Sequence, residues 1–496
     1  MRIIFAVLFV LLLLSMPVFC LDFQAGSIQN SIGGSLEGLA VAPLHNDSPR
    51  EDPTAVFKVQ TKSSFGDVSD LKINLRGEYD GTVLYPHDHK VFLDYTNIYQ
   101  DRNLFLSADE AYLDLFTTKA DFRLGIQKFA WGRLDELSPV DMLNTNSMTN
   151  PFIEDENTRK IGAPSARANF YSDLVNLELD WIPRWVPYRL PMPYERWFPP
   201  VFAAPESIDI SGYGPLLPAS ITVPVRANYR DIDMPACTFG NSEIGAKLSK
   251  TMGKWDISAM YFRGYDTMPV FDMPTELTIQ LDPQTFIPRI SLNVELEPRV
   301  FILEMYAFDL STTNGNFTFR GDAAFFKDRR YIRQIEGLIN EYFTPDMLQS
   351  MLSEVMKDPF NPHTFTLNPQ VIEKKNSAKY GLGFDYVRGD TSVTGQVIQE
   401  YIFNYNDKLL FNKNGVDTML TLSLRHMLLG GRFEAALYGS YGIEYRQFLI
   451  KPSISYDITD NLKATLAGLV FGGEKDSILG QYSSNDEIFL KVKYSY

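Results

Sequence analysis

Arginine, glutamine and aspartate side chains recur at short intervals in residues 121–144, the stretch with the most distinctive chemistry in this sequence. On an extended chain the apolar residues of 121–127 share one face and the polar residues share the other. The polar side chains that matter most here are Arg123, Gln127, Arg133, Asp135 and Asp141. Fixed charges of this kind can sort charged solutes through their local field. They can also pair with one another to hold a loop in place, and the two roles are compatible.

Residue types suited to covalent or metal chemistry are few. The five histidines are His45, His87, His89, His363 and His426. Residues 87–89 read His-Asp-His in a predicted turn, where an exposed polar role is the simpler interpretation because a structural zinc needs four ligands. His426 with Ser423 or Ser440 has no hydrolase motif around it, and no phosphate-binding glycine loop occurs. We therefore expect no enzymatic activity, no metal and no cofactor.

Segments in which apolar and polar side chains alternate recur along the chain and would position these charges. The clearest are 71–80, 416–427, 432–441, 446–457 and 488–496. Within them Arg425, Arg432, Glu434 and Lys451 fall on the polar face. A strand that is apolar on one side and polar on the other fits a barrel wall between lipid and a water-filled interior. We therefore expect these four side chains in the lumen.

The two ends of the chain agree with a membrane barrel. Residues 488–496 alternate in polarity and end with Tyr494 and Tyr496, which resembles the C-terminal assembly signal of bacterial outer-membrane β-barrels. At the other end, a basic residue, an uncharged run over 3–14 and a proline precede small residues. This pattern is typical of a secretory signal peptide, which we place at 1–20.

Composition narrows the class of protein. The chain has 496 residues, a formal net charge of -15 and 13% aromatic residues. After the first apolar run no other is long enough for a membrane helix, so a membrane location requires a closed barrel. The acidity argues against nucleic acid as a partner, since phosphates need a basic patch. Without the signal peptide Cys237 is the single cysteine, so no intramolecular disulfide is expected.

Connections between the predicted strands alternate in length. Short turns occur near 117–119, 172–173, 252–253, 314–315, 389–390, 430–431 and 459–461. Long connections lie between them, near 129–164, 183–241, 264–297, 328–376 and 404–415. Short connections on one side and long ones on the other are typical of outer-membrane barrels, whose long loops face the exterior.

We therefore predict an all-β protein, a single transmembrane antiparallel β-barrel of about 18 strands, with 16 as the alternative. The barrel would span 54–496 and follow an N-terminal periplasmic segment at 21–53. Its first strands are predicted at 54–62, 71–80 and 90–98. The last strand would return to the periplasmic side and close the barrel against the first.

Two of the long loops have a character of their own. Residues 183–205 are rich in proline and aromatic side chains, among them Trp185, Tyr194, Trp197 and Phe198. These aromatic residues could contact a ligand at the pore mouth, or the loop could pack on the barrel rim. In the second loop, apolar residues at helical spacing predict short helices over 332–342 and, after a Thr-Pro-Asp cap, over 344–355. The helices could form a lid on the barrel or pack on their own loop.

The stretch 121–144 also resembles a family of poorly characterised proteobacterial outer-membrane barrels, porin-like and similar to alginate-export-type channels. The matching residues are Arg123, Gly125, Gln127, Trp131, Gly132, Asp135 and Asp141. Asn144 is followed by Thr145, where the family pattern has proline. The resemblance covers about a tenth of the chain and implies a passive channel, with Arg123, Gln127, Arg133 and the aspartates near the pore.

We therefore expect a porin-like channel or transporter in the bacterial outer membrane for small polar or anionic solutes, with selectivity set by lumen charges and inserted loops. One alternative is a non-transporting surface barrel that acts as an adhesin, receptor or structural protein. Another is a transporter of hydrophobic substrates, favoured by the aromatic loop. Expected partners are outer-membrane lipid and lipopolysaccharide, the barrel assembly machinery and small solutes. An oligomer is compatible with the sequence.

Overall fold

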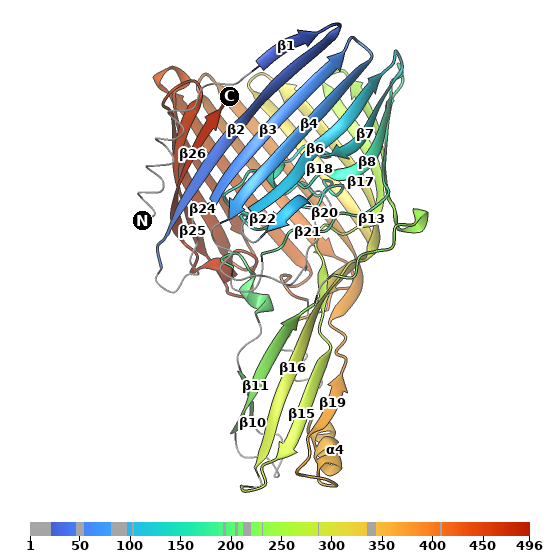
Figure 1. Cartoon of the computed structure of the whole chain (residues 1–496), viewed down its shortest axis with the longest axis vertical. Helices are drawn as coiled ribbons and strands as arrows, with labels where there is room; N and C mark the ends of the chain where they lie inside the picture. Colours follow the sequence, from blue (N-terminus) through green and yellow to red (C-terminus); the bar gives the residue numbers. More distant parts are fainter. Residues whose placement is uncertain are drawn as a thin grey trace.

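The computed structural model describes residues 21–45, 54–80, 97–101, 104–191, 195–203, 207–211, 220–230, 232–285, 287–334, 344–406 and 409–496. Most of these residues form a closed antiparallel barrel from which a narrow arm extends at one end (Figure 1). The predicted signal peptide at 1–20 lies outside the described residues and stays a prediction. No helix among the described residues is long and apolar enough to cross a membrane.

The barrel wall has the predicted 18 strands. The sheet hydrogen-bonds 20 described strands, but β1 (Leu21–Ala25) and β5 (Asn97–Asp101) each pair with a single neighbour and do not belong to the wall, and 20 − 2 = 18. The wall strands are β2 (Ile28–Pro43), β3 (Thr54–Phe65), β4 (Ser69–Asp80), β6 (Leu104–Phe116), β7 (Ala120–Gln127), β8 (Ala163–Phe170), β9 (Asn176–Ile182), β12 (Glu243–Met252), β13 (Trp255–Tyr265), β17 (Ile302–Asn314), β18 (Phe317–Ile332), β20 (Ile372–Arg388), β21 (Thr391–Ile402), β22 (Val416–Leu428), β23 (Phe433–Gly442), β24 (Gln447–Asp457), β25 (Leu462–Gly472) and β26 (Glu487–Ser495).

The barrel starts earlier in the sequence than predicted. The segment 21–53 was expected to be periplasmic, but it contains β2, which pairs with β3 on one edge and with β26 on the other. The predicted strand at 90–98 falls mostly outside the described residues, and its last two residues belong to β5. The expected strand number is therefore confirmed, but β2 and not a strand at 54–62 closes the barrel against β26.

The sequence of β2 explains why it was not recognised. It reads IQNSIGGSLEGLAVAP and alternates weakly in its first half, where small residues replace large apolar ones. Small residues are needed there because Tyr496 lies against this strand. A Cβ atom on Gly34 would come within 2.7 Å of the Tyr496 hydroxyl and 2.2 Å of the Lys58 carbonyl oxygen.

Loop lengths sort as predicted. Short turns join the strands at the end that holds Tyr496, including 66–68, 117–119, 253–254, 315–316 and 389–390. Long connections lie at the opposite end, which is therefore the extracellular side. Large apolar side chains are exposed on the outer wall, where they meet lipid, for example Phe57, Leu124, Trp181, Leu422 and Ile454.

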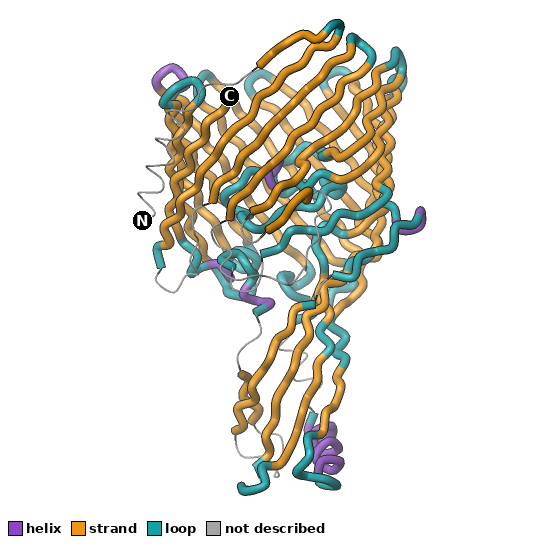
Figure 2. The backbone as a smooth tube through the Cα atoms, in the orientation of Figure 1, coloured by secondary structure: helices purple, strands orange, loops and turns teal. Residues whose placement is uncertain are grey.

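Three of the long extracellular connections combine into an arm (Figures 1 and 2). Its sheet has the order β10-β11-β16-β15-β19, and β14 also pairs with β16. The bounds are β10 (Ser207–Ser211), β11 (Ser220–Tyr229), β14 (Val270–Asp272), β15 (Thr275–Leu281), β16 (Pro288–Arg299) and β19 (His363–Leu367). The loops 183–241, 264–297 and 328–376 were predicted only as long connections, and single-sequence patterns do not show that their strands pair with one another.

The helix predicted over 344–355 is present as α4 (Pro345–Val355), capped by the Thr344 hydroxyl. Met351, Leu352 and Val355 pack on the apolar face of the arm sheet, against side chains such as Leu277. This helix packs on its own loop region and does not cover the barrel. Of the helix predicted over 332–342, residues 332–334 are described and are not helical, since β18 ends at Ile332 and Arg333 bridges to Leu409, and the rest lies outside the described residues.

Candidate functional site

The connection between β7 and β8, residues 128–162, folds into the barrel (Figures 1 and 2). We call this segment the inner loop. It bonds to Asp322 on β18 and Gln396 on β21, and also to Arg76 on β4. These strands belong to separate parts of the wall, so the inner loop crosses the lumen.

Asp322 on β18 anchors the start of the inner loop. Its carboxylate accepts hydrogen bonds from the backbone N–H groups of Arg133 (2.9 Å) and Leu134 (3.0 Å) and from the Ser138 hydroxyl (2.7 Å). Asp322 is almost completely buried. Hydrogen bonds to a buried carboxylate are strong. Losing one of them leaves the buried negative charge of Asp322 less well compensated.

Two ion pairs reinforce this anchor. The Arg133 guanidinium lies 3.1 Å from the buried carboxylate of Asp309 on β17. Asp135 forms a two-pronged pair with Arg320 on β18, with both distances at 2.8 Å. Its backbone N–H also donates to the Gln396 side chain (3.0 Å). The predicted site residues Arg133 and Asp135 therefore hold the loop on the wall.

Glycines leave the space that this docking requires. Gly132 has φ of 95°, and a Cβ there would lie 2.1 Å from the Ser138 hydroxyl oxygen. Leu134 packs over β20, where a Cβ on Gly381 would come within 2.6 Å and a Cβ on Gly383 within 3.0 Å of its side chain. Close packing of the loop against the wall thus depends on glycine in both partners.

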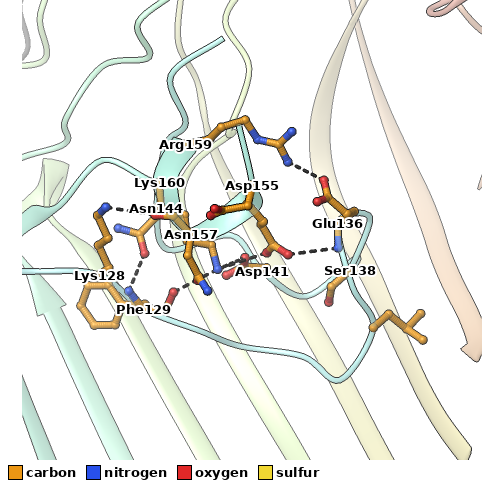
Figure 3. Close-up of polar contacts among 12 residues, drawn as sticks. Lys128, Phe129, Glu136, Ser138, Asp141, Asn144, Asp155, Asn157, Arg159 and Lys160 are labelled. Carbon is orange, nitrogen blue, oxygen red and sulfur yellow. Dashed lines mark hydrogen bonds and ion pairs between the residues drawn. The ribbon is translucent and has the colours of Figure 1, made fainter. Parts of the chain in front are cut away.

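Asn144 joins the two ends of the inner loop (Figure 3). Its side-chain oxygen accepts from the Phe129 N–H (2.5 Å), and its amide group donates to the Ile161 carbonyl (2.8 Å). Asn144 is buried, and it occupies the position that precedes proline in the family pattern. A structural tie between the loop ends explains an asparagine here without a role in the pore.

Lys160 holds two carboxylates together beside this tie (Figure 3). Its ammonium lies 2.5 Å from Asp141 and 3.2 Å from Glu156. Burial raises the pKa of Asp141 to about 7, against the opposing effect of Lys160 and with a contribution from the Glu156 carboxylate. Next to this group, Arg159 pairs with Glu136 (2.6 Å) at the loop edge.

The tip of the inner loop reaches the opposite part of the wall. Glu154 pairs with Arg76 on β4 (2.7 Å). The Lys451 ammonium on β24 donates to the Phe152 carbonyl oxygen (2.7 Å). The loop is therefore fixed at its start, its end and its tip, and it divides the lumen as a bridge.

An aromatic cluster also fixes the tip and connects it to the extracellular loops. The Phe152 ring lies 5.1 Å from Trp197, 4.9 Å from Phe471 and 5.6 Å from Tyr482, measured between centroids. The Tyr482 hydroxyl donates to the Trp197 carbonyl (3.1 Å). Segment 195–203 of the proline-rich loop is thus packed into the barrel mouth.

A cavity of about 1170 Å³ remains between the inner loop and the wall. The wall contributes eight basic side chains to its lining, Lys58, Arg76, Lys379, Arg425, Lys451, Lys463, Lys491 and Lys493, and four acidic ones, Glu37, Glu400, Asp417 and Glu434. The loop contributes four acidic side chains, Asp135, Glu136, Glu154 and Asp155, and one basic side chain, Arg159. A mainly basic wall therefore faces a mainly acidic loop edge.

A smaller cavity of about 160 Å³ adjoins the large one. Five residues line both cavities, Glu136, Leu137, Asn146 and Arg159 from the loop and Lys379 from β20. We call this junction the neck. No described carboxylate forms an ion pair with Lys379, whereas the neck charges of Glu136 and Arg159 pair with each other.

Of the predicted lumen residues, Asp135, Arg425, Glu434 and Lys451 line the large cavity. Arg123 points inward as predicted, but it pairs with Asp114 on β6 (2.7 Å) and lines neither cavity. Gln127 is buried and bonds to the Ser165 carbonyl, and Asp141 lines only the small cavity. Arg133 belongs to the loop anchor, and Arg432 lies in the exposed turn before β23.

The aromatic residues proposed as ligand contacts are packed against protein. Trp185 is buried beside Tyr265, with ring centroids 5.7 Å apart, and Trp197 is buried in the cluster at the loop tip. Phe198 packs edge-on against Tyr229 (5.7 Å). Tyr194 lies outside the described residues. Of the two interpretations of this loop, packing on the barrel rim fits the positions of Trp185 and Trp197, and ligand contact at the pore mouth does not.

Several residues of the site were not recognised in the sequence. Asp322 and Arg320 lie in a segment, FTFRGDAAFF, whose alternation places both in the lumen, but nothing local indicates that they hold a loop nearly 190 positions earlier. Lys379 likewise alternates with outward residues of β20. Alternation could have placed all three inside, whereas their partners depend on the path of the inner loop.

The described residues contain no group of three or more His, Cys, Asp or Glu side chains that could hold a metal ion. Cys237 is exposed and forms no disulfide.

Neither a protein-family model nor a curated protein matches this sequence. Solved structures of similar architecture include Pseudomonas aeruginosa OccD3, with 8% identity over 97% of this chain and 95% of that chain, at a TM-score of 0.48. Acinetobacter baumannii OccAB4 has 9% identity over 94% of this chain and 98% of that chain, at 0.45. The outer membrane channel DcaP of the same organism has 8% identity over 97% and 100%, at 0.40. At these values we draw nothing about function from the likeness.

The closed wall, the lipid-facing apolar side chains and the sorted loops define the class. The chain is a bacterial outer-membrane β-barrel of 18 strands. An inner loop divides its lumen, and an arm extends on its extracellular side.

Proposed function

We propose that this barrel is a porin-like channel through which small polar solutes diffuse, with a preference for solutes that carry an anionic group. The observation that supports this proposal best is the cavity of about 1170 Å³ between the inner loop and the wall, because its wall side presents eight basic and four acidic side chains. Charged side chains that line a pore set its ion selectivity through their electric field.

The pairing of these charges supports an anion preference further. Lys58, Lys379 and Lys493 have no ion-pair partner among the described residues. Three of the four acidic side chains on the loop edge are in ion pairs, Asp135 with Arg320, Glu136 with Arg159 and Glu154 with Arg76. A paired carboxylate repels an anion less than a free one, so the net field along the wall is positive.

Lys379 has a special position in this proposal. It is the basic wall side chain at the neck, where a solute moves between the small and the large cavity. Removing its charge is expected to reduce anion entry more than removing a charge outside the cavities.

Swelling of liposomes that contain the purified barrel tests the proposal. Gluconate should enter faster than an uncharged polyol of similar size. K379Q should lower the gluconate rate several-fold and leave the polyol rate unchanged. K254Q, in the exposed turn before β13, is the matched control and should change neither rate. Equal rates for all variants and both solutes, or no swelling at all, would contradict the proposal.

A surface-binding role is the second candidate, and the arm is the observation that favours it. The arm presents a sheet of six described strands beyond the barrel end, with its apolar face closed by α4 and its other face polar. A channel does not need such an extension. If the barrel admits no solute in the swelling assay but binds a cell surface through the arm, this candidate replaces the channel.

A further inference from the structure

An aromatic row marks the extracellular membrane boundary on one part of the outer wall. Tyr261, Tyr306 and Phe325 are direct cross-strand neighbours on β13, β17 and β18. Tyr306 and Phe325 are well exposed, and the rings of Tyr261 and Tyr306 lie 5.3 Å apart. Tyrosine and phenylalanine in a band at one height are typical of the level where acyl chains meet headgroups.

Charged residues replace the aromatic ones two positions further toward the exterior. Arg263, Glu304 and Lys327 form the next outward row on the same three strands. Lys327 is half exposed and pairs with Glu304 (3.0 Å). Because the two rows are consecutive on the outward face, this row lies at the height of lipid headgroups.

Two more cations extend this row, Arg330 at the end of β18 and Lys374 on β20. Arg329 points into the lumen toward Glu400, so its neighbour Arg330 points outward. Arg330 is the direct cross-strand neighbour of Lys374 on β20, whose side chain is 56% exposed and pairs with Asp328. We define the rim patch as the four cations Arg263, Lys327, Arg330 and Lys374. Against them stand two carboxylates, Glu304 and Asp328, so a net positive charge remains.

A projecting aromatic residue lies beside the rim patch. The short helix η2 (Phe239–Asn241) stands out from the outer wall at the right of Figures 1 and 2. Phe239 is 82% exposed, and the Arg263 guanidinium donates to the carbonyl of its neighbour Gly240 (3.1 Å). An exposed phenylalanine beside a row of aromatic residues on the outer wall is placed to contact acyl chains of the lipid.

Three other described wall strands carry no cation on their outer face near the extracellular end. The outward residues at the corresponding ends of β4, β25 and β26 are Tyr79, Val470 and Ile488, all exposed and uncharged. The outward cations of the rim patch therefore have no counterpart at these three strand ends. A local surplus of cations at headgroup height attracts anionic headgroups.

We propose that the rim patch binds the phosphorylated headgroup of a lipid in the outer leaflet. Arg263 and Lys327 are two strands apart, roughly 10 Å, and Lys374 is one strand further, so the patch can contact more than one phosphate of a headgroup. The aromatic row and Phe239 would contact the acyl chains below. Free phosphate would lack these apolar contacts. The proposal does not depend on the channel function.

Binding of lipopolysaccharide to the detergent-solubilised barrel, measured by native mass spectrometry or fluorescence titration, tests this inference. The variant K327Q/R330Q/K374Q should bind on the order of a hundredfold more weakly than the unmodified chain. The matched control K119Q/K254Q/R388Q removes three exposed cations at the periplasmic turns and should bind within about twofold of the unmodified chain. Dephosphorylated lipopolysaccharide should bind weakly to all three proteins.

Two further measurements separate the possible sources of failure. Heat-modifiable gel mobility shows whether the triple variant is folded. If the triple variant does not fold, the single variant K374Q replaces it and should also bind lipopolysaccharide more weakly than the unmodified chain. Inorganic phosphate should not compete at concentrations that saturate the lipid. Equal affinity of the triple variant and the control, or full competition by inorganic phosphate, would overturn the proposal.

Discussion

Asp322 joins the inner loop to the wall through three hydrogen bonds to a single carboxylate. We predict that D322N weakens the docking by about 2 kcal/mol, because an uncharged amide accepts more weakly and offers one oxygen instead of two. Single-channel recordings should show a current that fluctuates among several levels. D256N, on β13 and away from the loop, should leave a steady current. A steady current from D322N would show that the loop is held by other contacts.

Asp141 makes the docking sensitive to pH. Burial raises its pKa to about 7, above its ordinary value of ~3.9. For a carboxyl with a raised pKa, the stabilisation is fully present below the ordinary value and is lost as the pH rises through about 7. We therefore expect the loop to open more often at pH 8 than at pH 5.

The measurement is the frequency of current transitions between pH 5 and 8, for which D141N should give a flat profile. D155N is the control. Despite burial, the pKa of Asp155 lies below its ordinary value because it accepts from the Thr158 N–H, so it does not titrate in this range. Transition rates of the unmodified chain that do not change with pH would contradict this account of Asp141.

At the level of single residues, the sequence predicts the direction of side chains better than their partners. Arg123, Arg425 and Lys451 face inward as the alternation indicated. Yet Arg123 pairs with Asp114 on the adjacent strand β6, and Lys451 binds a backbone carbonyl of the loop tip. Direction follows from a period of two residues, whereas pairing depends on strand register and on the loop path, which local patterns do not contain.

The inner loop and β20 must fit together as elements. We predict that G381A displaces the loop, because the added Cβ would lie 2.6 Å from Leu134. The expected readout is faster proteolysis of the loop in the folded barrel. G439A is the matched control, since a Cβ at that position of β23 meets nothing closer than 3.9 Å. Equal proteolysis of the two variants would mean that Leu134 repacks without cost.

Strand β2 closes the barrel against β26. We predict that a chain refolded from Thr54 onward gives no heat-modifiable band, since β26 would lose the partner that pairs with it from Ser35 to Pro43. A chain that begins at Leu21 should refold. Efficient refolding of the shorter chain would show that β26 can close against β3. The role of Tyr494 and Tyr496 as an assembly signal stays a prediction.

Strands with regular alternation were predictable from the sequence. The arm, whose sheet combines strands from different loops, was not. The later wall strands from β22 to β26 match the expected segments closely. The arm was missed because β11 pairs with β16 and β15 with β19, which come from three different loops. Such pairing leaves no local signal beyond apolar runs that also suit an irregular loop.

The whole molecule combines a wall that faces lipid, a bridge across the lumen and an arm outside. The wall is predictable from sequence alone, because strand parity and loop alternation follow from the geometry of a closed sheet. The bridge and its basic opposite wall depend on side chains far apart in the chain, such as Glu154 and Arg76. The proposed channel function rests on the bridge and on the basic wall that faces it.

The reversal potential of the barrel in a planar bilayer tests this central claim most directly. Across a tenfold gradient of potassium chloride, the mainly basic wall predicts a potential whose sign corresponds to chloride preference. The variant K58Q/K379Q/K493Q, which removes three cavity cations that have no ion-pair partner among the described residues, should move that potential toward zero or reverse it. Potassium preference in the unmodified chain, or a folded barrel that passes no current, would contradict the account.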